Sequence, residues 1–258
     1  MDLGISGKTA IVCASSRGLG KGSAMALAQA GCRVIVNGRD EDVLTATASE
    51  IAEATGSEVV PVSGDVSDPA VQDALLTACP EPDILVNNNG GPPRRDYRDL
   101  NRQDMINGVV QNMVTPLELI QKTLDGMSER GFGRIVNITS LSVYMPIEGL
   151  DLSSGARAGL TAFLAGVCRN VGSNVTINNI LPGKMDTDRL QVGLKMGAKA
   201  RNTTFEEESA RQINEIPAGR FGNAEEFGNA CAFLCSAHAG YITGQNLIVD
   251  GGLYTSSF

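Results

Sequence analysis

Short apolar runs alternate with helix-forming segments along the whole chain, and this alternation restricts the fold more than any other feature. The apolar runs cover residues 10–12, 32–36, 58–62, 84–86, 134–138, 175–178 and 246–249. Each run is apolar on both faces of a strand, whereas the intervening segments, such as residues 40–54, have a helix-forming composition. Strands of this kind, separated by helices, form a mostly parallel sheet with helices on both faces. The sequence therefore predicts a doubly wound α/β fold of seven strands, in which ligands bind beyond the carboxyl ends of the strands.

The length of 258 residues suits one such domain, because α/β folds often exceed the usual domain size without dividing. The chain has no low-complexity tract and no composition shift that indicates a linker. We therefore expect a single domain over residues 1–258.

The formal net charge of −8 argues against a nucleic-acid partner, because nucleic-acid binding depends on basic side chains that neutralise phosphates. No apolar run approaches the roughly 20 residues that span a bilayer. The first residues, MDLGISGKT, lack the basic and apolar regions of a secretory signal. We expect a cytoplasmic protein with no membrane partner.

Cysteine and histidine usage argues against a metal site. The six cysteines contain no C-x-x-C pair, and we interpret them as small apolar residues of a reducing compartment. The only histidine is His238, which rules out a His-rich zinc site and argues against a Ser-His-Asp hydrolase. We expect His238 to end a helix, and we expect no bound metal.

A glycine-rich turn follows the first apolar run and opens a helix. Residues 13–20 are Cys-Ala-Ser-Ser-Arg-Gly-Leu-Gly. Glycines let backbone N–H groups approach a phosphate, and the N-terminus of the following helix favours negative charge. An ordinary strand-to-helix turn is the alternative. The candidate residues for binding a dinucleotide here are Ala14, Ser16, Arg17, Gly18, Leu19 and Gly20.

The end of the second run indicates which dinucleotide is preferred. NAD enzymes place an acidic residue there to bind the ribose hydroxyls, but this chain has Gly38 followed by Arg39, with Arg17 in the glycine-rich turn. Two guanidinium groups suit a 2′-phosphate, which favours NADP. NAD is the alternative cofactor if Asp40 reaches the ribose. The two arginines could also be solvated surface residues with no role in cofactor binding.

The spacing of Ala14, Gly18 and Gly20 resembles the cofactor turn of the short-chain dehydrogenase/reductase family, with alanine where most members have glycine. Further motifs of that family follow in order, and they are most similar to the 3-oxoacyl-(acyl-carrier-protein) reductase branch. They are Asp65-Val66, Asn87-Asn88-Asn89-Gly90, Pro182-Gly183 with Thr187, and the C-terminal stretches 216–222, 241–245 and 249–252. Asn89 replaces the alanine that is usual in the second of these motifs.

The resemblance implies further cofactor contacts. Asp65 and Val66 would hold the adenine, and Thr187 would bind the nicotinamide carboxamide. The turns that would complete the cofactor site contribute Asn87, Asn88, Gly90, Pro182 and Gly183.

The resemblance also implies catalytic positions. Ser140 stands where the family has the serine that orients the carbonyl, and Asn112 stands where it has the asparagine of a water relay. Thirteen residues beyond Ser140, however, the family's Tyr-x-x-x-Lys pair is replaced by Ser153 and Arg157. A serine hydroxyl is a much weaker acid than a phenol, and arginine stays protonated, so Arg157 would keep the charge and the ribose contacts but would not relay a proton.

Three hypotheses follow from this replacement. Water held by Asn112, Ser153 and Arg157 supplies the proton, or Tyr144 swings in from the loop after Ser140, or the protein binds a nucleotide as a sensor or assembly subunit with little redox activity. For Tyr144, packing within its loop is the simpler interpretation.

The resemblance implies a small carbonyl compound or alcohol as the substrate. Arg94 and Arg95 follow the fourth strand, where they would either clamp an anionic substrate or form a solvated basic loop. By resemblance, residues 184–215 form a substrate lid, and the protein forms a homo-oligomer, a tetramer or a dimer, through the helices that carry Asn112 and Arg157.

Overall fold

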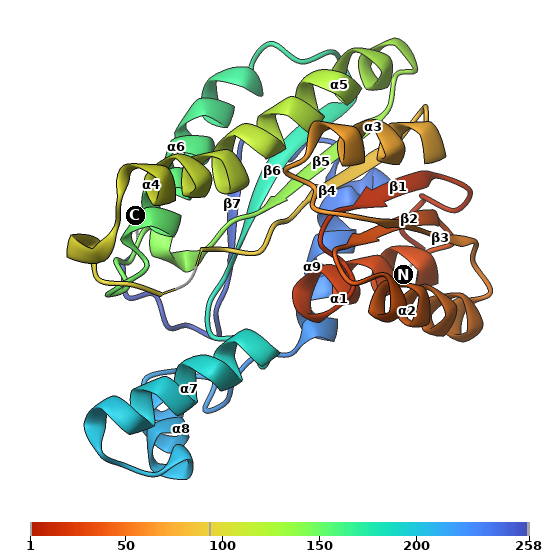
Figure 1. Ribbon diagram of the computed structural model, residues 1–258. Helices are drawn as coiled ribbons and strands as arrows, with labels where there is room; N and C mark the ends of the chain where they lie inside the picture. Colours follow the sequence, from red (N-terminus) through yellow and green to blue (C-terminus); the bar gives the residue numbers. More distant parts are fainter. Residues whose placement is uncertain (1, 93, 257–258) are drawn as a thin grey trace.

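The computed structural model describes residues 2–92 and 94–256. Its centre is a seven-stranded sheet with the strand order β3-β2-β1-β4-β5-β6-β7, in which every pair of neighbours is parallel (Figure 1). The strands are β1 (Thr9–Val12), β2 (Arg33–Gly38), β3 (Val59–Ser63), β4 (Ile84–Asn87), β5 (Gly133–Ile138), β6 (Val175–Pro182) and β7 (Asn246–Val249). The chain order reverses between β1 and β4, and doubly wound sheets bind ligands at this point.

Helices cover both faces of the sheet (Figure 1). They are α1 (Gly18–Gln29), α2 (Glu41–Thr55), α3 (Pro69–Ala78), α4 (Arg102–Val109), α5 (Thr115–Glu129), α6 (Asp151–Val167), α7 (Asp188–Arg201), α8 (Phe205–Asn214) and α9 (Ala224–Cys235). One apolar core joins the sheet to α1, α2 and α9, and a second joins its other face to α3, α5 and α6. Alternate strand residues supply the two cores, as Val12 and Ile11 do in β1.

The predicted doubly wound fold is confirmed, and each of the seven apolar runs forms a strand. The expectation that every strand is buried on both faces is wrong for β3 and β7, whose residues are largely half-buried or exposed. Both are edge strands with a neighbour on one side only. Pro61 is tolerated within β3 because an edge strand has one side on which no ladder hydrogen bond is needed.

Helices α1 and α9 cross at two glycines, which fixes the start of α1 against the sheet. A Cβ atom on Gly22 would lie 2.1 Å from the carbonyl oxygen of Ala224, and one on Gly228 would lie 2.2 Å from the carbonyl oxygen of Gly22. Any side chain at either position would therefore push the helices apart. The glycine-rich turn that precedes α1 is held in place by this contact.

Helices α7 and α8 form an arm that extends from the body of the molecule (Figure 1). Buried Glu208 of α8 joins its two helices, because it accepts hydrogen bonds from Arg211 and Gln212 and forms an ion pair with Arg201 at the end of α7. The arm follows β6 and therefore begins at the carboxyl end of the sheet.

No helix within residues 2–92 and 94–256 is both long and apolar enough to cross a membrane. His238 follows helix α9, which ends at Cys235, and lies in the short 3-10 helix η4 (Ala237–Ala239). Its Nε2 atom lies 2.8 Å from the carbonyl oxygen of Asp2.

Candidate active site

The glycine-rich turn between β1 and α1 is shaped to receive an anion. Ala14 and Gly18 both have positive φ, +43° and +55°. A Cβ atom on Gly20 would lie 2.3 Å from the carbonyl oxygen of Ala14, so only glycine fits there. The first turn of α1 contains no acidic residue, and no side chain caps its N–H groups. These free N–H groups and the close backbone fit the diphosphate of a dinucleotide.

The groups around the end of β2 are compatible with a 2′-phosphate. A Cβ atom on Gly38 would lie 2.8 Å from the Oγ atom of Ser16, which places the end of β2 directly against the glycine-rich turn. Arg39 is exposed and forms no ion pair with any described residue. The carboxylate of Asp40 instead accepts a hydrogen bond from the N–H group of Val43 and caps α2.

The turn after β4 is tied to the glycine-rich turn. Asn88 Nδ2 donates to the carbonyl oxygen of Ala14 over 3.0 Å. The carboxylate of Asp65, which follows β3, accepts a hydrogen bond from the N–H group of Ser67. The structure thus brings the motifs after β1, β3 and β4 to one edge of the sheet.

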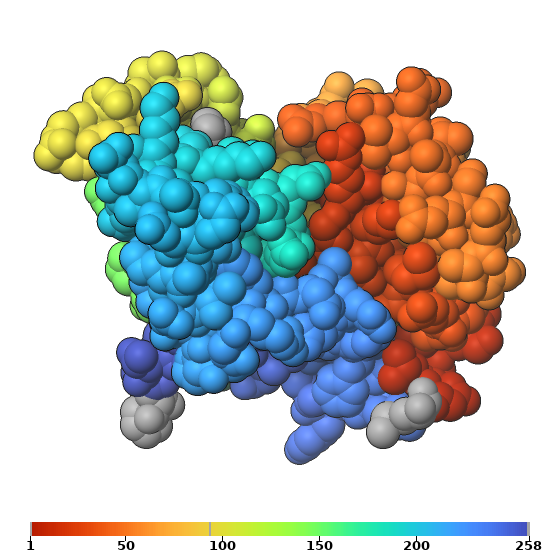
Figure 2. All heavy atoms as spheres, turned by 90° about the horizontal axis from the view of Figure 1, so that it is seen from below, coloured from red at the N-terminus to blue at the C-terminus, as the bar shows by residue number. Residues whose placement is uncertain are grey.

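The motif after β6 reaches the same edge. Gly183 packs against Asp250, since a Cβ atom on it would lie 2.5 Å from Asp250 Cβ. Thr187 caps α7 and lies against Gly18, with its Cγ2 atom 3.5 Å from where a Gly18 Cβ would be. Next to it, Asp188 lies 4.0 Å from Arg17. The start of the arm therefore touches the glycine-rich turn, and Figure 2 shows the blue-green arm beside the red N-terminal part.

Asn89 connects three parts of this edge, and the sequence interpretation missed its role. Its Nδ2 atom donates to Ser67 Oγ over 2.9 Å and to the carbonyl oxygen of Gln111 over 3.1 Å, while its own carbonyl oxygen accepts from Arg157. The sequence did contain a signal for this role, because Asn89 replaces the alanine that is usual in the family motif. A side-chain amide at that position needs hydrogen-bond partners.

Asn112 lies in a π-turn rather than in a continuous helix. The resemblance places Asn112 in a helix, but α4 ends at Val109, and η2 (Val110–Val114), a π-helical turn that contains Asn112, separates α4 from α5. The physical reason is Pro116, which has no N–H group to donate to the carbonyl of Asn112 and whose ring crowds that carbonyl. Asn112 Nδ2 donates to the carbonyl oxygen of Gly108, while its buried Oδ1 atom has no partner in the described part of the chain.

Ser153 and Arg157 form a hydrogen-bonded pair on α6. Arg157 donates from Nε to Ser153 Oγ over 3.2 Å, from Nη1 to the carbonyl oxygen of Ile138 over 2.6 Å, and from Nη2 to the carbonyl oxygen of Asn89 over 3.4 Å. Burial, together with the positive charge of nearby Arg189, lowers the pKa of Arg157 to about 10. Arg157 is nevertheless charged at neutral pH.

Ser140 lies two residues beyond the end of β5. It caps the short turn η3 (Leu141–Val143), because its Oγ atom accepts a hydrogen bond from the N–H group of Ser142 over 3.1 Å. Since Arg157 donates to Ile138 in the same segment, Ser140 and the Ser153–Arg157 pair lie at the same strand end.

A small polar cavity joins several of these groups. Asn87, Asn112, Asn137 and Arg157 are among the residues that line it. The Oδ1 atoms of Asn87 and Asn112 are buried and have no partner among the described residues. Because buried acceptors of this kind normally bind a donor, the cavity, which Arg157 also lines, suits a water molecule.

Tyr144 lies apart from this pair. Its hydroxyl oxygen accepts a hydrogen bond from Asn246 Nδ2 at the start of β7, and its ring packs against Tyr254 with centroids 5.6 Å apart. The structure therefore places Tyr144 beside the edge strand β7. Within the described residues, Tyr144 forms no hydrogen bond with Ser153 or Arg157.

Arg94 and Arg95 are both occupied by neighbouring groups. Arg95 forms an ion pair with Asp104 over 2.8 Å, and Arg94 Nε donates to the carbonyl oxygen of Glu148. A different arginine approaches the turn after β4: Arg189, in the first turn of α7, donates from Nη2 to the carbonyl oxygen of Pro92 over 3.3 Å.

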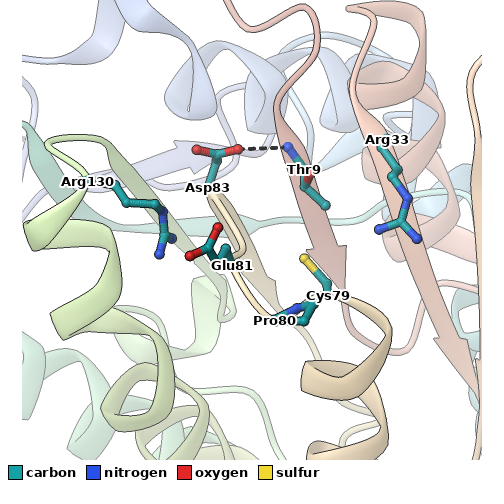
Figure 3. A pocket seen from close by; sticks show the side chains of 7 residues that line it. All are labelled: Thr9, Arg33, Cys79, Pro80, Glu81, Asp83 and Arg130. Carbon is teal, nitrogen blue, oxygen red and sulfur yellow. Dashed lines mark hydrogen bonds between the residues drawn. The ribbon is translucent and has the colours of Figure 1, made fainter.

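A second depression lies at the amino ends of the strands (Figure 3). Its lining includes Arg33 and Arg130, but Arg33 is paired with Glu58, and Arg130 donates to the carbonyl oxygen of Pro82. Asp83 in the same depression binds Lys8 and the N–H group of Thr9. Arg33, Arg130 and Asp83 thus have structural partners, and the depression is at the wrong end of the sheet for a ligand of a doubly wound fold.

Comparisons with known proteins agree with this geometry. The model of a family described as enoyl-(acyl carrier protein) reductase matches residues 13–254. The 3-oxoacyl-(acyl-carrier-protein) reductase FabG of Vibrio harveyi is 32% identical over 254 residues, which cover 98% of this chain and 99% of that protein. Among solved structures, L-sorbose reductase from Gluconobacter frateurii, complexed with NADPH and L-sorbose, matches with a TM-score of 0.92 and 29% identity, covering 99% of this chain and 100% of that one. YwfH, an NADPH-dependent reductase involved in bacilysin biosynthesis, matches with a TM-score of 0.91 and 28% identity, covering 97% and 100%.

Proposed function

Because the chain belongs to the short-chain dehydrogenase/reductase family, we propose that it is an oxidoreductase that interconverts a carbonyl compound and an alcohol with NADP(H). The observation that carries the proposal is the convergence of the anion-binding turn before α1 with Ser140 and the Asn112–Arg157 cavity at one edge of the sheet. A dinucleotide held at that edge lies across the carboxyl ends of the strands, where doubly wound folds bind it.

The choice of NADP rests on Arg39 and Arg17. Both guanidinium groups are exposed near the turn that would hold the diphosphate, whereas the carboxylate of Asp40 is used to cap α2. The guanidinium of Arg39, which has no ion-pair partner among the described residues, suits a 2′-phosphate, whereas the carboxylate of Asp40 is less able to bind ribose hydroxyls because it caps α2. The structural relatives solved with NADPH support the same choice.

A nucleotide bound at this edge would supply or accept the hydride. In the reducing direction, the Ser140 hydroxyl donates a hydrogen bond to the carbonyl oxygen of the substrate and orients it. As the carbon gains the hydride, its oxygen becomes an alkoxide that must receive a proton. The positive charge of Arg157 stabilises that alkoxide, and its buried position strengthens the effect.

The proton source is the finer part of the proposal. Ser153 and Arg157 stand where the family has tyrosine and lysine, and neither is an effective acid near pH 7. We propose that a water molecule in the cavity that Asn112 and Arg157 line delivers the proton, which the unpartnered Oδ1 atom of Asn112 supports. Without a positioned side-chain acid, we expect turnover about 10²- to 10⁴-fold below that of members with the tyrosine.

The arm of α7 and α8 lies within residues 184–215, which we propose act as the substrate lid. Its first turn touches the glycine-rich turn through Thr187 and Asp188 and the loop after β4 through Arg189. A lid in this position would enclose a substrate between the nucleotide and α7.

A nucleotide-binding protein with little redox activity is the second candidate. The Ser153–Arg157 pair favours it, because neither side chain is an effective acid near pH 7. Titration of NADPH fluorescence, followed by a panel of ketones and keto acids, tests both candidates. Turnover that is lost in Ser140→Ala supports the oxidoreductase, whereas saturable NADPH binding without turnover of any carbonyl compound supports the second candidate.

The protein would act as a homo-oligomer, a dimer or a tetramer. Met105, Ile106 and Val109 of α4 are 46%, 44% and 38% exposed, and Phe163 of α6 is 51% exposed. Apolar side chains of this size favour burial against another surface. Light scattering of the purified chain measures the number of copies.

A further inference from the structure

Arg157 carries a buried positive charge whose recorded partners are all neutral. Arg157 is 7% exposed, and it donates three hydrogen bonds, one to a hydroxyl oxygen and two to carbonyl oxygens. In the described chain it forms no ion pair with a carboxylate. Buried charges are normally paired, and a guanidinium has five N–H donors, so two N–H groups of Arg157 remain for another acceptor.

Arg189 brings a second positive charge to the same loop. Arg157 donates to the carbonyl oxygen of Asn89, and Arg189 donates to that of Pro92, three residues further along the turn after β4. Arg189 also lies over Gly91, where a Cβ atom would be 2.4 Å from its Nη1 atom. The two charges are close enough for Arg189 to lower the pKa of Arg157. Like charges in such proximity repel, and an anion between them removes the repulsion.

The acidic side chains of the neighbouring elements have other partners. Asp188, next to Arg189 in sequence, lies 4.0 Å from Arg17, and Asp186 accepts a hydrogen bond from Gln191. Asp104 of α4 is paired with Arg95. None of these carboxylates neutralises Arg157 or Arg189.

We propose that the substrate carries a carboxylate or phosphate group, which Arg157 and Arg189 bind together beside residues 89–92. This inference rests on the proposed function and adds the substrate class to it. A guanidinium group binds a carboxylate or a phosphate through two parallel N–H donors. This planar arrangement matches the oxygens of either anion better than an ammonium group does. Because Arg189 belongs to the arm and already contacts Pro92, an anion bound there also links the start of α7 to the loop after β4.

The anionic group lies close to the reacting carbonyl. Arg157 contacts Ser153 and Ile138, and Ser140 follows Ile138 by two residues. A substrate whose carbonyl oxygen meets Ser140 therefore has its anion only a few bonds away. This requirement points to short 2-oxo or 3-oxo acids, or to a phosphorylated ketone of similar length.

Matched pairs of compounds test the inference on the intact protein with NADP⁺ bound. Isothermal titration calorimetry compares 2-oxobutanoate and 3-oxobutanoate with their methyl esters, and dihydroxyacetone phosphate with dihydroxyacetone. At least one anion should bind about 10- to 100-fold more tightly than its neutral counterpart. Arg189→Gln should lose most of that difference, and Arg189→Lys should retain part of it. Arg98→Gln is the control, because Arg98 is exposed and pairs with Asp96.

Equal affinity for the members of every pair, or a preference for anions that Arg189→Gln leaves unchanged, overturns the inference. Which anion binds distinguishes a carboxylate from a phosphate substrate. Parallel assays of NADPH oxidation separate this inference from the proposed function. Equal reduction of acids and esters supports the proposed function and contradicts the inference of an anionic substrate. Tight anion binding that depends on Arg189, without any reduction, supports the anion site and contradicts the proposed function.

Discussion

Arg157 and Ser153 face each other across one turn of α6, with Arg157 Nε donating to Ser153 Oγ over 3.2 Å. Residues four apart on a helix are neighbours, so the sequence spacing alone permits this contact. The hydroxyl of Ser153 acts here as an acceptor, and its own proton remains free for a third group. The pair therefore holds two polar groups at the strand ends, and under the proposed function a water molecule delivers the proton.

The double substitution Ser153→Tyr with Arg157→Lys should raise turnover with NADPH. It supplies a phenol and an ammonium, and a positioned general acid contributes about 10²- to 10⁴-fold to the rate. Steady-state kinetics with the best substrate of the wild type measures the change in kcat. Arg157→Lys alone is the matched control and should give no such gain. A double variant that folds, binds NADPH and turns over no faster than the wild type contradicts the proposed role of the pair.

Ala14→Gly should stabilise the protein. Ala14 has a φ of +43°, a conformation that costs an L-residue about 1–2 kcal/mol. Glycine removes this strain but loses about 0.5–1 kcal/mol to its greater freedom in the unfolded chain, so a net gain of up to about 1 kcal/mol is expected. Denaturant unfolding measures it. Ala46→Gly, on the exposed face of α2, should instead lose about 1 kcal/mol, and equal losses in both variants would show that Ala14 is unstrained.

The fold could be predicted from the sequence because its signals are local. Each strand is a short apolar run, and each cofactor motif follows a strand directly, so a parallel sheet brings the motifs to one edge. The sequence does not indicate that β3 lies at an edge of the sheet, because strand order depends on the path of the whole chain.

The contacts within the candidate site were less predictable. The partners of Arg157 include the carbonyls of Ile138 and Asn89, which lie 19 and 68 residues away in the chain. A backbone carbonyl carries no mark in the sequence that identifies it as an acceptor. The π-turn at Asn112 had a local signal in Pro116, four residues later, because proline removes the hydrogen bond that a continuous helix would make there.

Arg39→Ala should weaken NADPH binding more than NADH binding. A charge-assisted hydrogen bond to the 2′-phosphate contributes about 1.5–3 kcal/mol, so the dissociation constant for NADPH should rise about 10- to 100-fold while that for NADH changes little. Fluorescence titration of both nucleotides gives the ratio. Arg33→Ala is a matched control on the same strand, because Arg33 begins β2 and pairs with Glu58. An unchanged ratio in Arg39→Ala would place the 2′-phosphate elsewhere.

Glu208→Gln should destabilise the protein at neutral pH and lose this effect in acid. Hydrogen bonds from Arg211 lower the pKa of Glu208 to about 2 from an ordinary value of 4.5. A carboxyl whose folded pKa lies below its unfolded pKa stabilises the fold above the unfolded value, and this stabilisation is lost as pH falls from about 4.5 towards 2. Removing the charge should cost about 1–3 kcal/mol at pH 7, and denaturant unfolding from pH 7 down to pH 3 should show the gap to the wild type narrowing. Glu206→Gln, exposed on the same helix, is the control and should change little at any pH. A gap that stays constant with pH would mean that the ionised carboxylate of Glu208 does not hold α7 and α8 together.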